Sequence, residues 1–173
     1  MKLTNRLFDE IAIGDSASIR RVCTESDLYV FANVSGNLHP ANLPDLEARF
    51  DTDGDPGTGA VAPSMWLASL IGNVIGTRLP GPGTLYLRQE LDFVAPMHLG
   101  DTITVTVKVA AKGEDRQVTL DCACVDQAGK LVTRGRAVVR APAEKLRIEP
   151  PELPQMIVQT HDSFERLMRA CRD

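Results

Sequence analysis

Residues 64–79 form an apolar segment that has to be buried, and this segment constrains the fold more than any other part of the chain. As a helix it is about 24 Å long, with apolar residues on nearly every face. Pro63 precedes it and Pro80 follows it, as expected at helix ends. A membrane-spanning helix needs roughly 20 apolar residues. Because the segment is shorter and is bounded by prolines, it predicts a central helix inside a protein core.

Two glycines lie inside this predicted helix. Gly72 and Gly76 each lower helix stability by about 1 kcal/mol relative to alanine. On an ordinary surface helix this cost has no compensation. Together with Ala68 and Ser69, the glycines predict a smooth helix side against which a sheet lies closely.

After the central helix, apolar and polar residues alternate with a period of two, which is typical of strands with one buried face. Turn-forming residues occupy positions 112–113 and 126–129. The pattern predicts an antiparallel meander of four or five strands wrapped around the apolar helix, an α+β fold. The expected strands are residues 17–22, 85–93, 102–109, 118–122 and 131–140.

The N-terminal half carries clear helix signals. Thr24 is the expected N-cap, with Asp27 in the capping-box position, and Gly36 is the expected end. A short helix is expected at 45–50 and a solvated loop at 51–57. That loop resembles the opening of a calcium site but lacks the spacing and the closing glutamate. The apolar side of the first helix is expected to contain Leu28, Val30, Phe31 and Val34.

Composition excludes several function classes. The 173 residues fit one domain, and a net charge of -4 with scattered aromatic residues argues against nucleic-acid binding. The cysteines show no metal-ligand spacing, and Cys122 and Cys124 are expected to act as small apolar residues on one face of a strand. No charged and apolar leader opens the chain, so a cytoplasmic location without membrane contact is predicted.

The order of these elements resembles the hotdog fold, and three segments narrow the resemblance further. They are residues 31–42 (FANVSGNLHPAN), 76–84 (GTRLPGPGT) and 93–103 (FVAPMHLGDTI). Together they are similar to the MaoC-like (R)-specific enoyl-CoA hydratases, also called hydratase 2. The resemblance covers about residues 7–141. It implies binding of an acyl-CoA thioester, a homodimer, and no metal or redox cofactor.

The family pattern D-x-N-P-x-H supplies the acid and base for hydration of an enoyl thioester. On this pattern the family Asp falls on Asn37, the Asn on His39 and the His on Asn42, while Pro40 is retained. A carboxamide is neither an acid nor a base near pH 7. Both dyad positions therefore lack a titrating group.

The resemblance also implies an oxyanion hole built from backbone N–H groups at the start of the central helix. Relatives commonly read His-Gly-Met there, and this chain reads Pro63-Ser64-Met65. Ser64 and Met65 keep their N–H groups, whereas a proline has none. Trp66 is expected in the core, with contact to the ligand left open. Pro40 and Trp66 are the candidate substrate-binding residues.

Three interpretations of residues 37–42 remain open. In the first, His39 alone serves as acid and base, oriented by Asp45, and reduced hydratase activity persists. In the second, the pocket binds acyl-CoA without catalysis. In the third, His39 only caps a turn. His98 and His161 are predicted to be surface residues.

The resemblance further predicts a division into a hotdog domain, residues 1–142, and a Pro-rich linker with a C-terminal helix, residues 143–173. The sequence also resembles the MaoC-like domain of bifunctional enoyl-CoA hydratase/phosphate acetyltransferase proteins, in which such a connector precedes the acyltransferase. A hotdog thioesterase is the alternative enzyme class. It needs a carboxylate near the entrance of the central helix, and residues 60–73 contain none.

Overall fold

The computed structural model describes residues 2–44, 59–154 and 156. The helix expected at 45–50, the loop at 51–57, the C-terminal helix, Asp45, His161 and Cys171 lie outside this part. The described elements are β1 (Leu3–Thr4), the 3-10 helix η1 (Phe8–Glu10), β2 (Ser16–Val22), α1 (Glu25–Ser35), the 3-10 helix η2 (Pro40–Asn42), α2 (Ser64–Thr77), β3 (Leu85–Phe93), β4 (Thr102–Lys112), β5 (Gln117–Val125), β6 (Leu131–Arg140) and β7 (Arg147–Ile148).

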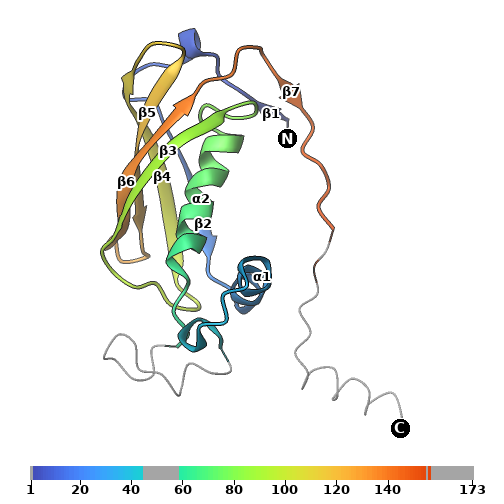
Figure 1. The fold of residues 1–173 in the computed structure, drawn as a ribbon, viewed down its shortest axis with the longest axis vertical. Helices are drawn as coiled ribbons and strands as arrows, with labels where there is room; N and C mark the ends of the chain where they lie inside the picture. The colour runs from blue at the N-terminus through green and yellow to red at the C-terminus, as the bar shows by residue number, and fades with distance from the viewer. Residues whose placement is uncertain (1, 45–58, 155, 157–173) are drawn as a thin grey trace.

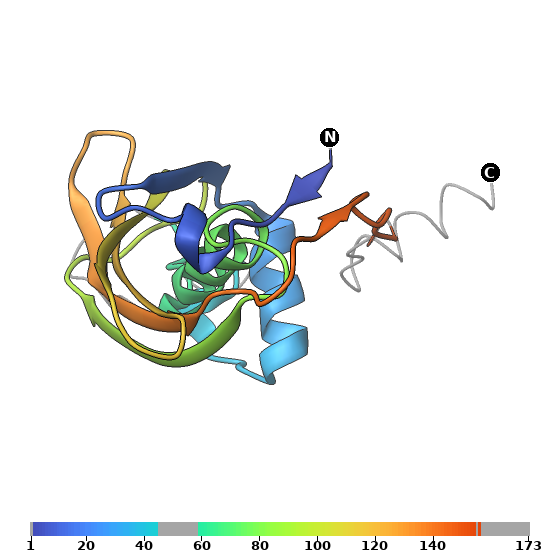
Figure 2. The ribbon, with the colours of Figure 1, turned by 90° about the horizontal axis from the view of Figure 1, so that it is seen from above.

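A five-stranded antiparallel sheet curls around α2, which is the arrangement that the hotdog resemblance implies (Figures 1 and 2). The strand order is β2-β4-β5-β6-β3. The expected strands are therefore confirmed, but the meander is correct only for β4, β5 and β6. β3 pairs with β6, from Leu85 opposite Arg140 to Phe93 opposite Thr133, and forms an edge of the sheet. Alternation of apolar residues reports which face of a strand is buried and not which strand lies beside it.

The core lies between α2 and the inner face of the sheet. Alternate residues of β4 and β5 are buried, including Val105 and Leu120, as the period of two predicts. No helix in the described part of the chain is long and apolar enough to cross a membrane. The buried residues of α2 are Trp66, Leu67, Leu70, Ile71, Val74 and Ile75.

One side of α2 is uncovered, so the prediction of a helix buried on all faces is wrong. Met65 is 62% exposed, and Ser69 and Asn73 are exposed on the same side. A Cβ atom added at Gly72 or Gly76 would meet nothing within 4 Å. The small residues therefore face away from the sheet, because the larger apolar side chains take the sheet-facing positions.

Capping fixes both ends of α1 as predicted. The Thr24 hydroxyl accepts a hydrogen bond from the N–H of Asp27 at 3.2 Å, and the Asp27 carboxylate accepts one from the N–H of Thr24 at 3.0 Å. Gly36 closes the helix with φ of 69°, in the left-handed region. Leu28 is buried, but Val34 is 80% exposed and does not belong to the packed side of the helix.

Asn5 joins three segments that are far apart in the sequence. Its Nδ2 donates to the carbonyl oxygens of Pro82 and Glu144 at 3.0 and 2.8 Å, and its Oδ1 accepts from the N–H of Leu146 at 2.9 Å. The side chain is 1% exposed, so these bonds satisfy polar groups that water cannot reach. β7, within the predicted linker, pairs with β1 beside it.

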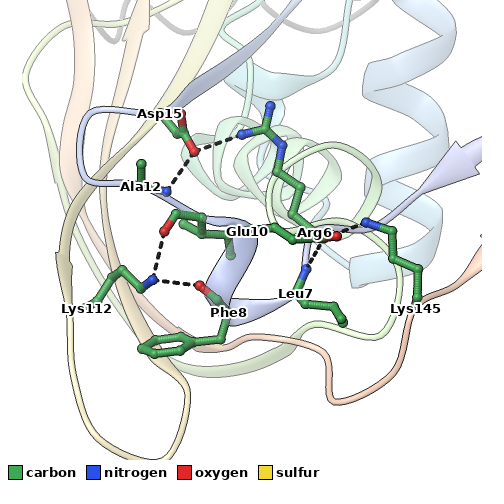
Figure 3. A network of polar contacts seen from close by, with 9 residues as sticks. Arg6, Leu7, Phe8, Glu10, Ala12, Asp15, Lys112 and Lys145 are labelled. Atoms are coloured by element: carbon green, nitrogen blue, oxygen red, sulfur yellow. Dashed lines mark hydrogen bonds and ion pairs between the residues drawn. The ribbon is translucent and has the colours of Figure 1, made fainter.

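A second polar cluster holds η1 over the end of the sheet that lies away from residues 37–42 (Figure 3). The Lys112 ammonium donates to the carbonyl oxygens of Phe8 and Ile11 at 2.7 and 2.8 Å and lies 4.2 Å from the centre of the Phe8 ring. A hydrogen bond from Lys145 lowers the pKa of the Glu10 carboxyl group. These contacts anchor the N-terminal segment and leave the opposite end of α2 open.

Candidate active site

A hollow of about 580 Å³ lies where the end of α1, η2 and the start of α2 meet. The lining is mostly apolar, with a few polar groups gathered at one place, which is typical of sites for small ligands. No carboxylate, lysine or arginine is among the lining residues of the described chain. The lining residues are Phe31, Ser35, Asn37, His39, Ala41, Asn42, Val61, Pro63, Ser64, Met65 and Pro96.

A larger depression of about 730 Å³ lies over β3, β5 and β6. Four of its charged side chains pair across the strands, Arg136 with Asp121 at 3.0 Å and Arg134 with Asp92 at 3.4 Å. Such pairs satisfy one another and are typical of a solvated sheet surface. The smaller hollow is the better candidate because it brings together the polar residues that the sequence singles out.

Local hydrogen bonds fix the loop after α1. The Ser35 hydroxyl accepts from the N–H of Asn37 at 3.2 Å, and Asn37 Oδ1 accepts from the N–H of His39 at 3.1 Å. An asparagine side chain that accepts a hydrogen bond from the backbone N–H two residues further along the chain forms an Asx-turn. Pro40 then begins η2, and the N–H of Asn42 donates to the carbonyl oxygen of His39 at 2.9 Å.

This loop brings the two predicted dyad positions side by side. Asn37 Nδ2 donates to Asn42 Oδ1 at 3.5 Å, the long limit of a hydrogen bond. Asn42 Nδ2 donates to the carbonyl oxygen of Val61 at 2.7 Å. The predicted positions therefore share one hollow, but they hold a pair of neutral carboxamides bonded to each other.

The start of α2 forms another side of the hollow. Ser64 and Met65 line it as the first two helical residues, after Pro63 at the N-cap. The first N–H groups of a helix have no acceptor within it and carry a partial positive charge. The N–H of Trp66 already donates to the carbonyl oxygen of Pro63 at 2.8 Å, which leaves Ser64 and Met65 as the candidate donors to a ligand oxygen.

Not every residue singled out by the sequence lies on the hollow. Trp66 is 5% exposed and packs in the core, and Pro40 is half-buried; neither belongs to the lining. His98 is half-buried and not on the open surface as predicted. Its backbone forms an isolated antiparallel β-bridge with Val61. Its Nδ1 lies 3.7 Å from a carboxylate oxygen of Asp101. The apolar lining could not be identified from the sequence, because no local pattern marks a pocket residue. Its unidentified members are Phe31, Ala41, Val61 and Pro96.

The described cysteines lie away from the hollow and are buried. Burial raises the pKa of the Cys23 and Cys124 thiols to about 12 and that of Cys122 to about 11. Thiols with such pKa values stay protonated and unreactive. For Cys122 and Cys124, which are both buried on β5, the predicted role as small apolar residues on one face of a strand is confirmed. Among residues 2–44, 59–154 and 156, no three His, Cys, Asp or Glu side chains are grouped to hold a metal ion.

Comparisons with known proteins agree with this picture. No protein-family profile matches the chain. The chain is 40% identical over 140 residues to an (R)-specific enoyl-CoA hydratase of Rhodospirillum rubrum, with 79% of this chain and 92% of the relative covered. It is 34% identical over 140 residues to a 3-hydroxybutyryl-CoA dehydratase of Methylorubrum extorquens, with 80% and 85% covered.

A solved structure is similar over nearly the whole chain. The unliganded R-hydratase PhaJ1 of Pseudomonas aeruginosa superposes with a TM-score of 0.85 at 35% identity, covering 92% of this chain and all of the other. The likeness includes the curled sheet and its central helix. The predicted α+β hotdog fold is confirmed.

Proposed function

Because the chain belongs to the MaoC-like (R)-specific enoyl-CoA hydratase family, we propose that its hollow binds the acyl end of a 2-enoyl-CoA or 3-hydroxyacyl-CoA thioester. We propose that it hydrates the enoyl thioester, and dehydrates the hydroxylated one, far more slowly than its relatives do. The observation that carries the proposal is the carboxamide pair Asn37 and Asn42 within a hollow whose described lining lacks carboxylates. The pocket is retained and the acid/base pair is not.

The chemistry explains the expected loss of rate. Adding water across an enoyl thioester needs a base that takes a proton from water, an acid that protonates the α-carbon, and donors for the enolate oxygen. The N–H groups of Ser64 and Met65 supply donors in a favourable helix-terminal position. Asn37 and Asn42 transfer no proton near neutral pH. The hollow therefore keeps the groups for binding a thioester and lacks the groups for proton transfer.

His39 supports a second candidate function, a slow hydratase that uses one histidine. Its side chain lines the hollow, and its backbone is fixed by Asn37. Imidazole both accepts and donates a proton near neutral pH. In this alternative, the protein still hydrates the enoyl thioester slowly, and this activity depends on His39. A thioesterase is less favoured, because no carboxylate lines the described hollow to activate water.

Filling the hollow tests the binding site. Val61 lines it, so the larger side chain of Val61→Phe occupies ligand space. We expect the affinity for butyryl-CoA, measured by calorimetry, to fall at least about 10-fold, which corresponds to about 1.4 kcal/mol. Val34→Phe is the matched control, because Val34 is 80% exposed and does not line the hollow. Unchanged affinity in a folded Val61→Phe protein would place the ligand elsewhere.

We further propose a homodimer that covers the β3 edge of the sheet. β3 pairs on one side only, with β6, and exposes several large apolar side chains. The uncovered small-residue side of α2 adds a surface that a second copy can approach closely. The exposed apolar residues on and next to β3 are Leu85, Tyr86, Leu87, Phe93 and Val94.

A charge on this edge tests the dimer. Leu87 is 41% exposed on β3, and Leu87→Lys would bury an ammonium group if a second chain covers the edge. We expect light scattering after gel filtration to show the mass of two chains for the natural sequence and one for the variant. Ile13→Lys is the control, because Ile13 is 68% exposed in a turn outside the sheet. A natural chain that elutes as a monomer would exclude the dimer.

Adding water to an enoyl thioester consumes no oxidant or reductant, and its proton transfers and its enolate oxygen can be served by protein groups. We therefore propose that the site works without a metal or redox cofactor. The cytoplasmic location and the division into residues 1–142 and 143–173 stay predictions from the sequence.

A further inference from the structure

Hydrogen bonds to the backbone fix the orientation of the two carboxamides in the hollow. Asn37 Oδ1 accepts from the N–H of His39 at 3.1 Å, and Asn42 Nδ2 donates to the carbonyl oxygen of Val61 at 2.7 Å. Only the oxygen of a carboxamide accepts and only its nitrogen donates, so each side chain has a single orientation that suits its partner. Asn37 therefore presents its amino group to the oxygen of Asn42.

This pair has unused hydrogen-bonding capacity. The contact between Asn37 Nδ2 and Asn42 Oδ1 measures 3.5 Å and is weak. An amino group has two hydrogens and a carbonyl oxygen has two acceptor positions. The hydrogen bonds of the described residues use one of each. A donor and an acceptor thus remain available next to each other in the hollow.

The neighbouring hydroxyl of Ser35 does not compete for this role. It donates to the carbonyl oxygen of Phe31 at 2.6 Å and accepts from the N–H of Asn37 at 3.2 Å. The hollow is otherwise lined by apolar residues, including Val61 and Pro96, and by two further polar residues, His39 and Ser64. A polar group of the ligand that reaches Asn37 and Asn42 meets the paired carboxamides.

A hydroxyl group matches the pair, because it accepts from Asn37 Nδ2 and donates to Asn42 Oδ1 at the same time. A keto group only accepts, and a methylene or an alkene carbon does neither. We propose that the Asn37–Asn42 pair selects acyl-CoA thioesters that carry a hydroxyl group close to the thioester, as in a 3-hydroxyacyl chain, over saturated and 2-enoyl chains of equal length. This inference rests on the proposed acyl-CoA binding and adds a preference that proton transfer does not require.

Calorimetry with (R)-3-hydroxybutyryl-CoA and butyryl-CoA on the full chain tests the preference, while enoyl absorbance in the same sample reports any dehydration. Two hydrogen bonds predict at least about 10-fold tighter binding of the hydroxylated thioester. In Asn37→Ala and Asn42→Ala the two affinities should agree to within about 2-fold. Asn33→Ala is the matched control, since Asn33 is exposed on α1 and bonds only its own helix.

The outcomes separate this inference from the proposed function. Equal affinity of the natural chain for both thioesters overturns the hydroxyl preference and leaves acyl-CoA binding in place. A preference that persists in a folded Asn37→Ala protein also overturns it. If neither thioester binds, both the inference and the proposed function fail. The ratio measured on the natural chain decides the matter even if a variant does not fold.

Discussion

Replacing both carboxamides, Asn37→Asp together with Asn42→His, is expected to raise the rate of crotonyl-CoA hydration at least about 100-fold. General acid and base groups contribute about 10² to 10⁴ in rate when they are correctly placed. The aspartate oxygen can still accept from the N–H of His39, as Asn37 does now. One imidazole nitrogen can donate to the carbonyl oxygen of Val61, as Asn42 does, and the other then faces the carboxylate.

The single variants and a surface variant are the controls. Asn37→Asp alone and Asn42→His alone each supply one proton-transfer group, so we expect little gain from either. Asn33→Asp adds a carboxylate on α1 outside the hollow and should leave the rate unchanged. Loss of the enoyl absorbance measures the hydration rate of the natural chain and of all four variants. A folded double variant without any gain would show that these positions do not correspond to the acid/base dyad of the relatives.

Gly135→Ala is expected to destabilise the fold by about 3 kcal/mol or more, because β3 passes very close to this residue. A Cβ atom at 135 would lie 2.0 Å from the carbonyl oxygen of Glu90 and 2.9 Å from the Cα of Leu91. Both are backbone atoms, so no side-chain rotation relieves the clash. β3 pairs only with β6 and would have to move away from it.

Urea unfolding compares this variant with Gly113→Ala, a matched change in the turn between β4 and β5. A Cβ at Gly113 would lie 3.7 Å from its nearest neighbour, an ordinary contact, so we expect a change below about 1 kcal/mol. Equal stability of Gly135→Ala and the natural chain would mean that β3 does not approach β6 as described.

Local patterns were sufficient to predict most elements of this fold. The capping box at Thr24, the left-handed Gly36 and the period of two in β4 to β6 each involve residues close in sequence. The position of β3 beside β6 could not be predicted in this way, because it depends on a crossover of the chain between β3 and β4. The exposed side of α2 was missed for a related reason. Small residues allow close packing but do not specify what packs there.

The candidate site was likewise predictable only in part. The motif resemblance predicted that Asn37 and Asn42 occupy one site. In the structure both line the hollow, with Asn37 Nδ2 3.5 Å from Asn42 Oδ1. The bond from Asn42 to Val61 was beyond sequence reasoning, because Val61 comes from a segment 19 residues away. The position of Trp66 shows that two residues adjacent in sequence need not face the same site. Trp66 follows Met65 directly, yet the helix turns it into the core while Met65 faces the hollow.

The most direct test of the account measures binding and turnover of crotonyl-CoA on the same sample of the natural chain, by calorimetry and by loss of enoyl absorbance. We predict clear binding with turnover at least about 100-fold below that of an (R)-specific enoyl-CoA hydratase assayed in parallel. Any residual turnover that disappears in His39→Ala would assign it to that histidine. Turnover equal to that of the parallel hydratase would contradict the account, and so would a failure to bind.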